Sequence, residues 1–322
     1  MSNVNITRLV ENIRSGTNVY TPIVELIVNS IQAIDESKSG SGSVDIQIKR
    51  EGQEDLEGLR GVDGFIVSDD GIGFNQRNRD SFDELYTEQK KADGGKGFGR
   101  FTCLKYFDHM HVRSIFLDDG KLQERTFRMG LGKDIIVDEE VCPVAKGKTG
   151  SVVEIAGIKS VKFPDKGIDT ISRVIVERLL PYFVDAERPC PRIVIRDEEA
   201  VAPPISLNDY LAKENSQIIE MPVADGAFTL SANGEEKTFM VRVFKFYSPR
   251  ASRSKVSLVA HRREVTDVAL QSHIPEFADE FYEPVPGDDG ARGRNFVIKA
   301  YVFGDYLNDN VSLERGEFRF QT

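Results

Sequence analysis

Apolar residues recur every three or four positions in two stretches near the N-terminus. The first, from Ile6 to Ile13, predicts a short helix that ends at Gly16. The second begins at Thr21-Pro22, where Thr21 is a suitable N-cap and Pro22 suits the first helical position. The apolar stripe of this second helix consists of Ile23, Leu26, Ile27, Ser30, Ile31 and Ile34.

Strict alternation of apolar and polar residues predicts a strand over 44–50, and an apolar run predicts a buried strand at 64–67. Residues 74–97 carry many charges and glycines without clear periodicity, which favours a mobile lid. The pattern further predicts helices at 99–106 and 168–184 and strands at 111–117, 124–130 and 151–156.

Two proline-rich stretches, Pro189–Pro191 and Pro203-Pro204, place the expected domain boundary near residue 200. We therefore expect two α+β domains, 1–200 and 201–322. In the second domain the pattern predicts one helical stretch at 267–283 and strands at 217–223, 226–232, 237–247, 255–260, 296–303 and 316–320.

Composition is that of a soluble globular chain, with 40% hydrophobic and 29% charged residues. The absence of a long apolar run and of a basic-then-apolar leader predicts a cytoplasmic protein without membrane contact. Three widely spaced cysteines predict buried thiols in a reducing compartment.

The net charge of −10 argues against attraction of the whole surface to nucleic acid or anionic lipid. Residues 245–263 are an exception, because they contain six basic residues and no acid. This segment is either a solvated strand–loop–strand or a patch that contacts the phosphates of DNA. Its basic residues are Lys245, Arg250, Arg253, Lys255, Arg262 and Arg263.

Glu25 and Asn29 are four residues apart on the second predicted helix, so they project from one face, at the border of the apolar stripe with Gln32. A carboxylate there can orient and deprotonate a water molecule. The amide oxygen of Asn29 is a suitable ligand for Mg²⁺. An ordinary solvent-facing Glu and Asn would have the same spacing.

Asp69 follows a buried strand, so its carboxylate enters a space with little water and needs a donor such as an adenine amino group. Gly71 and Gly73 allow a sharp turn and the close approach of a flat ring. A plain Asp-Asp-Gly turn is the alternative. Farther on, Gly94, Gly95, Gly97 and Gly99 lead into a helix and can form an anion-binding loop, although the segment is not a Walker A motif.

In their order along the chain, Glu-x₃-Asn, Asp-x-Gly-x-Gly, the glycine-rich segment and Thr149-Gly150-Ser151-x-Val resemble the motifs of the GHKL ATPase superfamily. This superfamily contains gyrase B subunits, ninety-kilodalton heat-shock chaperones, histidine kinases and MutL proteins, with the MORC ATPases alongside. The layout is most similar to the MutL- and MORC-like members. The resemblance implies a Bergerat-type α/β sandwich that binds Mg-ATP, followed by a smaller transducer-like (ribosomal S-five-like) α+β domain.

The resemblance also implies roles for individual residues. Glu25 corresponds to the general base, Asn29 to the Mg²⁺ ligand, and Asp69 with Gly71 and Gly73 to the adenine-binding box. Ser151 stands where a Thr usually supports the adenine contacts, and Gln32 stands where many members have Asp. The lid, around 74–99, would contribute the phosphate-binding residues Gly95, Lys96, Gly97, Phe98 and Gly99. Judged from the residues alone, Lys90, Lys96 and Arg100 either screen the charge of a phosphate or are solvated lid residues.

In the second half, Ala260-His261-Arg262 stands where MutL-like transducer domains have Asn-Gly-Arg. Arg315 stands where a MutL lysine reaches the γ-phosphate, and a plain strand-edge arginine is the alternative. The resemblance implies ATP or ADP as ligand, an ATP-dependent homodimer, and further C-terminal domains or a partner protein.

Slow ATP hydrolysis that drives lid closure, and that acts on DNA through 245–263, is the first functional hypothesis. The alternatives are a non-hydrolysing switch that dimerises on ATP and a chaperone-like ATPase with protein clients; antiviral defence is compatible with the layout. A histidine kinase is disfavoured because no His precedes residue 109.

Overall fold

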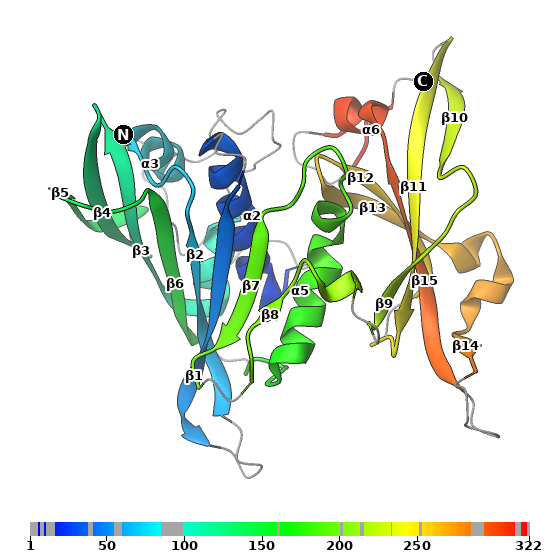
Figure 1. Ribbon diagram of the computed structural model, residues 1–322, viewed down its shortest axis with the longest axis horizontal. Coiled ribbons are helices and arrows are strands. Elements are labelled where there is room, and N and C mark those ends of the chain that lie inside the picture. Colours follow the sequence, from blue (N-terminus) through cyan, green and yellow to red (C-terminus); the bar gives the residue numbers. More distant parts are fainter. Residues whose placement is uncertain are drawn as a thin grey trace. The chain divides into compact units, whose positions relative to one another are not determined.

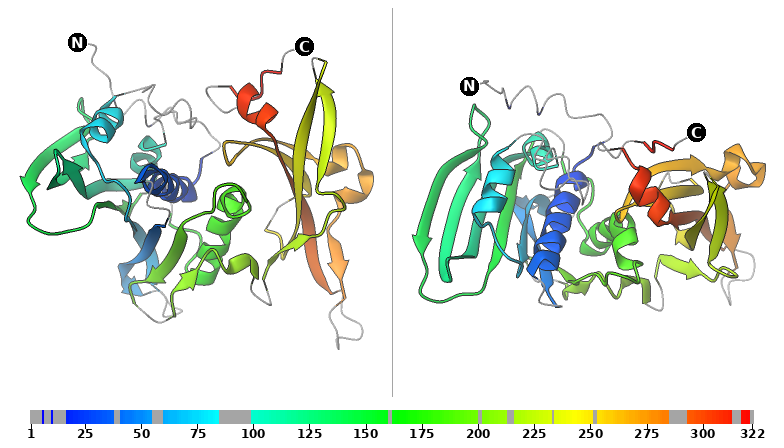
Figure 2. Two further views of the ribbon diagram at one scale, coloured as in Figure 1. Left: turned by 45° about the horizontal axis from the view of Figure 1, so that its top comes forward. Right: turned by 90° about the horizontal axis from the view of Figure 1, so that it is seen from above.

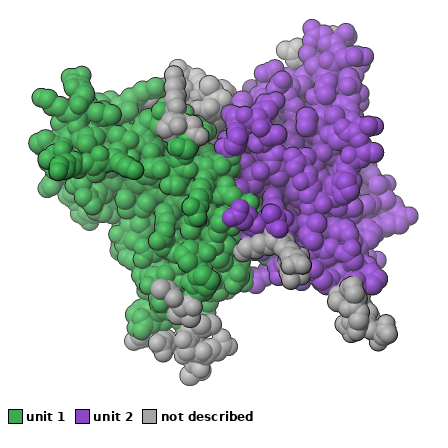
Figure 3. Space-filling model, in the orientation of Figure 1, with its two compact units in different colours: residues 1–178, 190–208 green, residues 179–189, 209–322 purple. Residues whose placement is uncertain are grey.

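A computed structural model describes most of the chain in two compact units (Figure 3). The first comprises 1–178 and 190–208, and the second comprises 179–189 and 209–322. A domain boundary near residue 200 stays a prediction. The described residues are 6, 10, 17–37, 41–54, 60–84, 99–159, 162–199, 202–212, 216–232, 234–250, 253–284, 293–312 and 317–320.

The first unit contains an eight-stranded sheet in the order β5-β4-β3-β6-β2-β1-β7-β8 (Figure 1). All neighbouring strands are antiparallel except β1 and β7, which are parallel. The strands are β1 (Ser43–Glu54), β2 (Arg60–Asp69), β3 (Phe107–Asp118), β4 (Lys121–Met129), β5 (Ile136–Pro143), β6 (Gly150–Ile158), β7 (Arg192–Asp197) and β8 (Ile205–Ser206).

Helices α2 (Tyr20–Ser37), α4 (Phe101–Tyr106) and α5 (Ile168–Phe183) lie on one face of this sheet (Figure 2). The predicted stripe of α2 is buried, and Ile23 and Ile27 are fully excluded from solvent. Burial of each such side chain contributes about 1.5–3 kcal/mol. The apolar stripe therefore packs α2 against the sheet, and Glu25 and Asn29 lie at the border of this packed face.

The start of α2 differs slightly from the prediction. The helix begins at Tyr20 rather than after Thr21, because the side chain of Asn18 accepts a hydrogen bond from the Tyr20 amide at 3.0 Å. The predicted lid region also contains a helix, α3 (Gln76–Asp83), whose N-cap Asn75 accepts from the amide of Asn78 at 2.9 Å. Ser81 is the only buried residue of α3, so the sequence has no apolar stripe that predicts this helix.

The second unit contains a seven-stranded sheet whose main path is β10-β11-β15-β12-β13, with β9 beside β11 and β14 beside β15. A short helix, α6 (Asp305–Asn310), packs Leu307 against Phe239 and Val302 of the sheet. The strands are β9 (Ile218–Met221), β10 (Ala227–Ala232), β11 (Glu235–Tyr247), β12 (Lys255–Ala260), β13 (Arg263–Ala269), β14 (Phe281–Glu283) and β15 (Arg294–Phe303).

The helix expected at 267–283 is wrong. Val268 belongs to β13, where it pairs with Val256 of β12. Two 3₁₀ turns follow, Leu270–Ser272 and Pro275–Ala278. Pro275 fixes the start of the second turn and cannot continue a helix that begins earlier.

No helix among the described residues is long and apolar enough to cross a bilayer. Strands, helices and two mixed sheets give the α+β class expected from the sequence.

Candidate nucleotide site

Asp69 lies at the end of β2, and its carboxylate is held by groups from two elements. Ser30 of α2 donates its hydroxyl to Oδ2 at 3.0 Å, and the Gly71 amide donates to Oδ1 at 3.0 Å. Burial raises the pKa of Asp69 to about 6, although these hydrogen bonds and one from the Ser151 amide oppose the rise. A carboxylate so placed is oriented, costly to ionise and able to accept a further donor.

Ser151 is directly opposite Asp69, because β2 and β6 pair in that register. Its hydroxyl lies 3.0 Å from the hydroxyl of Ser114 on β3. Ser114 also donates to the Gly150 carbonyl and accepts from the Phe74 amide, both at 2.8 Å. Ser114 thus joins β6 to the glycine turn after Asp69.

The glycine turn packs too closely for side chains. A Cβ on Gly71 would lie 2.6 Å from the carbonyl carbon of Ala33 on α2, and the Ile72 amide bonds to the Ala33 carbonyl at 3.1 Å. Gly73 has φ +75°, and a Cβ there would lie 2.2 Å from the Ile115 carbonyl oxygen. The turn therefore runs wedged between α2 and β3, as a close backbone approach requires.

Glu25 and Asn29 project from α2 as the spacing predicts. Asn29 is exposed and Glu25 is partly buried. A Cβ on Gly99 would lie 2.4 Å from Oε2 of Glu25, so the last glycine of the expected lid rests against the carboxylate. The Glu25 charge also adds to the burial that raises the pKa of the Cys103 thiol to about 12. Gln32 is partly buried on the same helix.

Arg100 differs from the expected solvated or phosphate-facing lid residue. Its guanidinium is buried and donates to the carbonyls of Ser81 at 3.2 Å and Glu84 at 2.8 Å. Burial lowers the pKa of Arg100 to about 10. Its role is to fasten α3 to the start of α4.

The remaining lid residues lie outside the described part of the chain, and their roles stay predictions. They are Lys90, Gly94, Gly95, Lys96, Gly97 and Phe98, together with Arg315 in the second half.

Two functional candidates were not predicted from the sequence. Ser30 was assigned to the apolar stripe, and its small polar side chain in that stripe is the signal that could have indicated a buried partner. Ser114 carries no local signal, because its partners come from β6 and from the turn after β2.

Both lysines of the basic segment 245–263 are bound to acidic groups of the second unit. Lys245 is 3.0 Å from Glu283, and Lys255 contacts Glu264 at 2.7 Å and Asp267 at 2.9 Å. These contacts favour the solvated strand–loop–strand interpretation for both lysines.

Arg262 does not fit the expected DNA patch either. It is 6% exposed, stacks over Tyr182 at 4.5 Å and pairs with Asp185 at 3.2 Å. It also donates to the Arg188 carbonyl at 2.9 Å. His261 and Arg262 both have positive φ, as a two-residue hairpin turn requires. Here Arg262 serves the packing of the hairpin.

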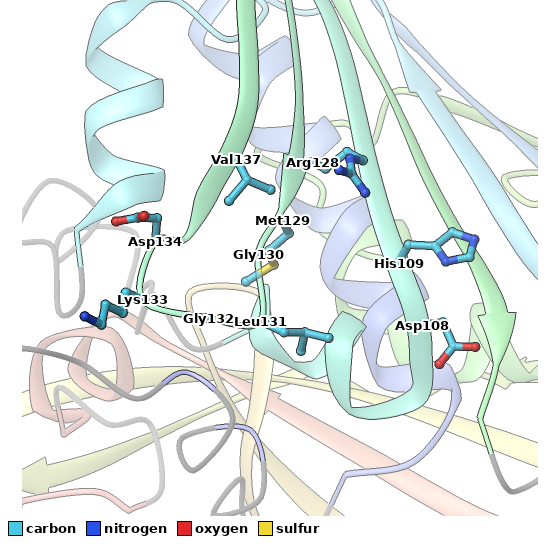
Figure 4. Close-up of a pocket in the computed structure, with 10 residues that line it drawn as sticks. All are labelled: Asp108, His109, Arg128, Met129, Gly130, Leu131, Gly132, Lys133, Asp134 and Val137. Carbon is cyan, nitrogen blue, oxygen red and sulfur yellow. The ribbon is translucent and has the colours of Figure 1, made fainter.

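A pocket of about 370 Å³ lies elsewhere on the first sheet, at the β4–β5 turn (Figure 4). It contains none of the candidate residues, and the side chain of Arg128 on its rim pairs with Asp138. The pocket is lined by Asp108, His109, Arg128, Met129, Gly130, Leu131, Gly132, Lys133, Asp134 and Val137.

No protein-family model and no curated protein matches the chain. Among solved structures, the N-terminal domain of a DNA repair protein is similar with a TM-score of 0.51 and 12% identity, over 98% of this chain and 92% of that one. The ATPase region of Saccharomyces cerevisiae topoisomerase II has a TM-score of 0.44 and 12% identity, over 88% of this chain and 72% of that one. The same region bound to ICRF-187 has 0.43 and 13%, over 88% and 73%.

These similarities concern the fold. The eight-stranded mixed sheet with helices on one face belongs to a fold that this chain shares with the N-terminal domain of a DNA repair protein. The second unit, a mixed sheet with a short helix, is consistent with a transducer-like domain.

Proposed function

We propose that the first unit binds adenine nucleotides and hydrolyses Mg-ATP slowly. The observation that carries the proposal is the Asp69 carboxylate, fixed by Ser30 and Gly71 and raised in pKa by burial. An amino group of adenine would supply the donor that an ionised carboxylate needs in such surroundings. The hydroxyl of Ser151, which lies 3.0 Å from that of Ser114, is another polar group of the candidate site, on the residue opposite Asp69.

The residues at the other end of the candidate site fit a magnesium–phosphate group. Asn29 is exposed on the same helical face as Glu25, and its amide oxygen is a ligand that Mg²⁺ accepts. Mg²⁺ bound there would neutralise phosphate charge during the reaction. Glu25, in contact with the backbone at Gly99, would orient a water molecule and accept its proton.

The consequence of binding, in this proposal, is a change of shape. The expected lid, around 74–99, would close over the phosphates, and closure would favour an ATP-dependent homodimer. The proposal also includes the similarity to MutL- and MORC-like proteins and the contact of Arg315 with the γ-phosphate. Contact with DNA through 245–263 stays a separate prediction, and the pairing of Lys245, Lys255 and Arg262 with acidic or carbonyl groups argues against these three residues as the contacts.

The test is phosphate release and nucleotide binding by Glu25→Gln. We expect release to fall at least a hundredfold while ATP affinity is retained, because the variant keeps the shape of the side chain and loses the base. Glu36→Gln on the exposed last turn of α2 is the matched control and should hydrolyse ATP at the original rate. Equal rates in all three proteins would exclude Glu25 as the base.

A further inference from the structure

Strand β10 forms one edge of the second sheet, and it pairs with β11 over Ala227–Ala232. The partnership of β11 with β15 starts only at Met240. The hairpin of β10 and the first part of β11 is therefore a two-stranded ribbon that extends beyond the sheet (Figure 1). Two-stranded ribbons have little stability by themselves in water.

The pattern of hydrogen bonds shows which backbone groups of β10 point outward. The Val241 amide donates to the Gly226 carbonyl at 2.8 Å, so these two residues form a hydrogen-bonded pair. Because such pairs alternate along an antiparallel ladder, Phe228 and Leu230 bond to β11. The N–H and C=O groups of Ala227, Thr229 and Ser231 then face away from it, where none of the described strands pairs with them.

The edge formed by β10 lacks the charges and the proline found on the edge strand β5 of the first sheet. Its six residues include no charge and no proline, and Phe228 and Leu230 are 39% and 54% exposed. By contrast, the edge strand β5 carries Asp138, Glu139 and Glu140 and ends at a proline. Natural proteins place charges and prolines on edges to prevent pairing with another chain, so an apolar edge without them indicates a pairing surface.

We propose that β10 pairs with the β10 of a second copy of this chain, antiparallel about a two-fold axis at Thr229. In this register the outward groups of residues 227, 229 and 231 meet the outward groups of 231, 229 and 227 of the other copy. Phe228 then lies opposite Leu230 of the second copy, and the reciprocal pair forms beside it. These two positions form the closer, non-hydrogen-bonded type of pair, in which side chains touch.

The uncharged edge avoids most of the repulsion between two copies. In a chain with a net charge of −10, like-charge repulsion opposes most contacts between copies. The proposed seam brings together only apolar and hydroxyl side chains. The nearest charged residue on the Phe228 face is Lys237, which pairs with Leu230 across the ribbon and with Glu235 as an ion pair.

The contact is small compared with the roughly 1,600 Å² of a standard interface, so the dimer should be weak and should dissociate on dilution. It needs no nucleotide, and it is independent of the hydrolysis proposed above. Where nucleotide also brings first units together, this contact would raise their effective concentration.

The test is sedimentation of the full chain over a range of concentrations without nucleotide. Thr229→Pro removes an outward N–H from the seam and should weaken the dimer by at least about tenfold, while Thr229→Val keeps the N–H and should not. Leu230→Glu is a second variant. The new carboxylate lies opposite Lys237 within its own ribbon and places a charge in the seam. Val268→Glu, at a 44% exposed position of β13, is its matched control.

We expect a monomer–dimer equilibrium for the original chain and for both controls, and a shift towards monomer for Thr229→Pro and Leu230→Glu. Thermal unfolding of each variant shows whether it is folded, and Leu230→Glu decides the result should Thr229→Pro unfold. A chain that is monomeric at every concentration would overturn the proposal. So would a dimer that none of the variants weakens, because its contact would then lie elsewhere.

Discussion

The carboxylates of Asp69 and Asp70 are consecutive in the chain but bind to different elements. Asp69 accepts hydrogen bonds from Ser30 on α2 and from Gly71, whereas Asp70 accepts from the amide and hydroxyl of Ser43 at the start of β1, at 2.7 and 3.1 Å. Asp70 is exposed and fastens two strands. Asp69 faces the candidate site, where burial raises its pKa.

Replacing each carboxylate by an amide should therefore change the free energy of unfolding of the ligand-free protein in opposite directions. A group whose folded pKa is raised, from 3.8 to about 6, favours the fold when protonated, and this contribution is lost as pH rises through 6. Asp69→Asn should then raise the free energy of unfolding by about 1–2 kcal/mol at pH 7.5. The gain should shrink as pH falls from 6 towards 4.

Asp70→Asn should instead lower stability by about 1 kcal/mol, because it weakens the acceptor for the Ser43 amide. Chemical unfolding at pH 7.5 and at pH 4.5 measures both variants. A loss of stability for Asp69→Asn at pH 7.5 would contradict the assignment of a raised pKa.

Ser30 should control the pH at which nucleotide binding is lost. Its hydroxyl stabilises the ionised form of Asp69, so Ser30→Ala should raise the pKa of that carboxyl further above 6. Since the ionised carboxylate accepts the adenine donor, the acid limb of the affinity profile should move to higher pH. Titration of ATP into both proteins from pH 5 to 8 measures the shift, and the ratio of the two affinities removes the titration of ATP itself. A ratio that does not vary with pH would contradict this coupling.

Gly73 and Gly120 provide a matched pair for the turn after Asp69. Their φ values are +75° and +76°, but a Cβ at Gly120 meets nothing within 4 Å, whereas one at Gly73 lies 2.2 Å from the Ile115 carbonyl oxygen. Gly120→Ala should cost about 1 kcal/mol from backbone strain alone. Gly73→Ala should cost roughly 3 kcal/mol or more, since backbone of β3 must move. Equal losses in denaturant unfolding would show that the turn is not confined by β3.

Arg262 should be a stability residue of the second unit. Arg262→Ala removes the ion pair with the partly buried Asp185, the ring contact with Tyr182 and a hydrogen bond to the Arg188 carbonyl, and should cost about 2 kcal/mol. Lys237→Ala, which removes an exposed partner of Glu235, should leave unfolding unchanged. Unfolding followed by near-ultraviolet circular dichroism compares them. An Arg262→Ala protein as stable as the original would contradict the buried role.

The elements with strong apolar periodicity were predictable from the sequence, because their own side chains form the core. Helix α2 and strand β12 (255–260) are examples. Helix α3 was not predictable from periodicity, since it buries only Ser81, and β5 was missed because seven of its eight residues are not buried. Both elements are held by neighbours rather than by an apolar face of their own.

The candidate site likewise contains some residues that were predictable from the sequence and others that were not. The spacing of Glu25 and Asn29 follows from helical geometry, so their common face was predictable. The pairing of Ser151 with Asp69 depends on the register of β2 and β6, and the Ser114 contacts depend on β3. The acidic partners of the basic segment were not predictable for the same reason, because Glu283 reaches Lys245 from 38 residues away along the chain.

The most direct test of the central claim is calorimetric titration of Mg-ATP into the original protein and into Asp69→Asn and Asp70→Asn at pH 7.5. We expect binding by the original chain, a similar affinity for Asp70→Asn, and a loss of at least about a hundredfold for Asp69→Asn, because a buried donor–acceptor pair to adenine is broken. Equal affinity for ATP in the original protein and in Asp69→Asn, or no binding by either, would contradict the assignment of Asp69 as the adenine-binding carboxylate.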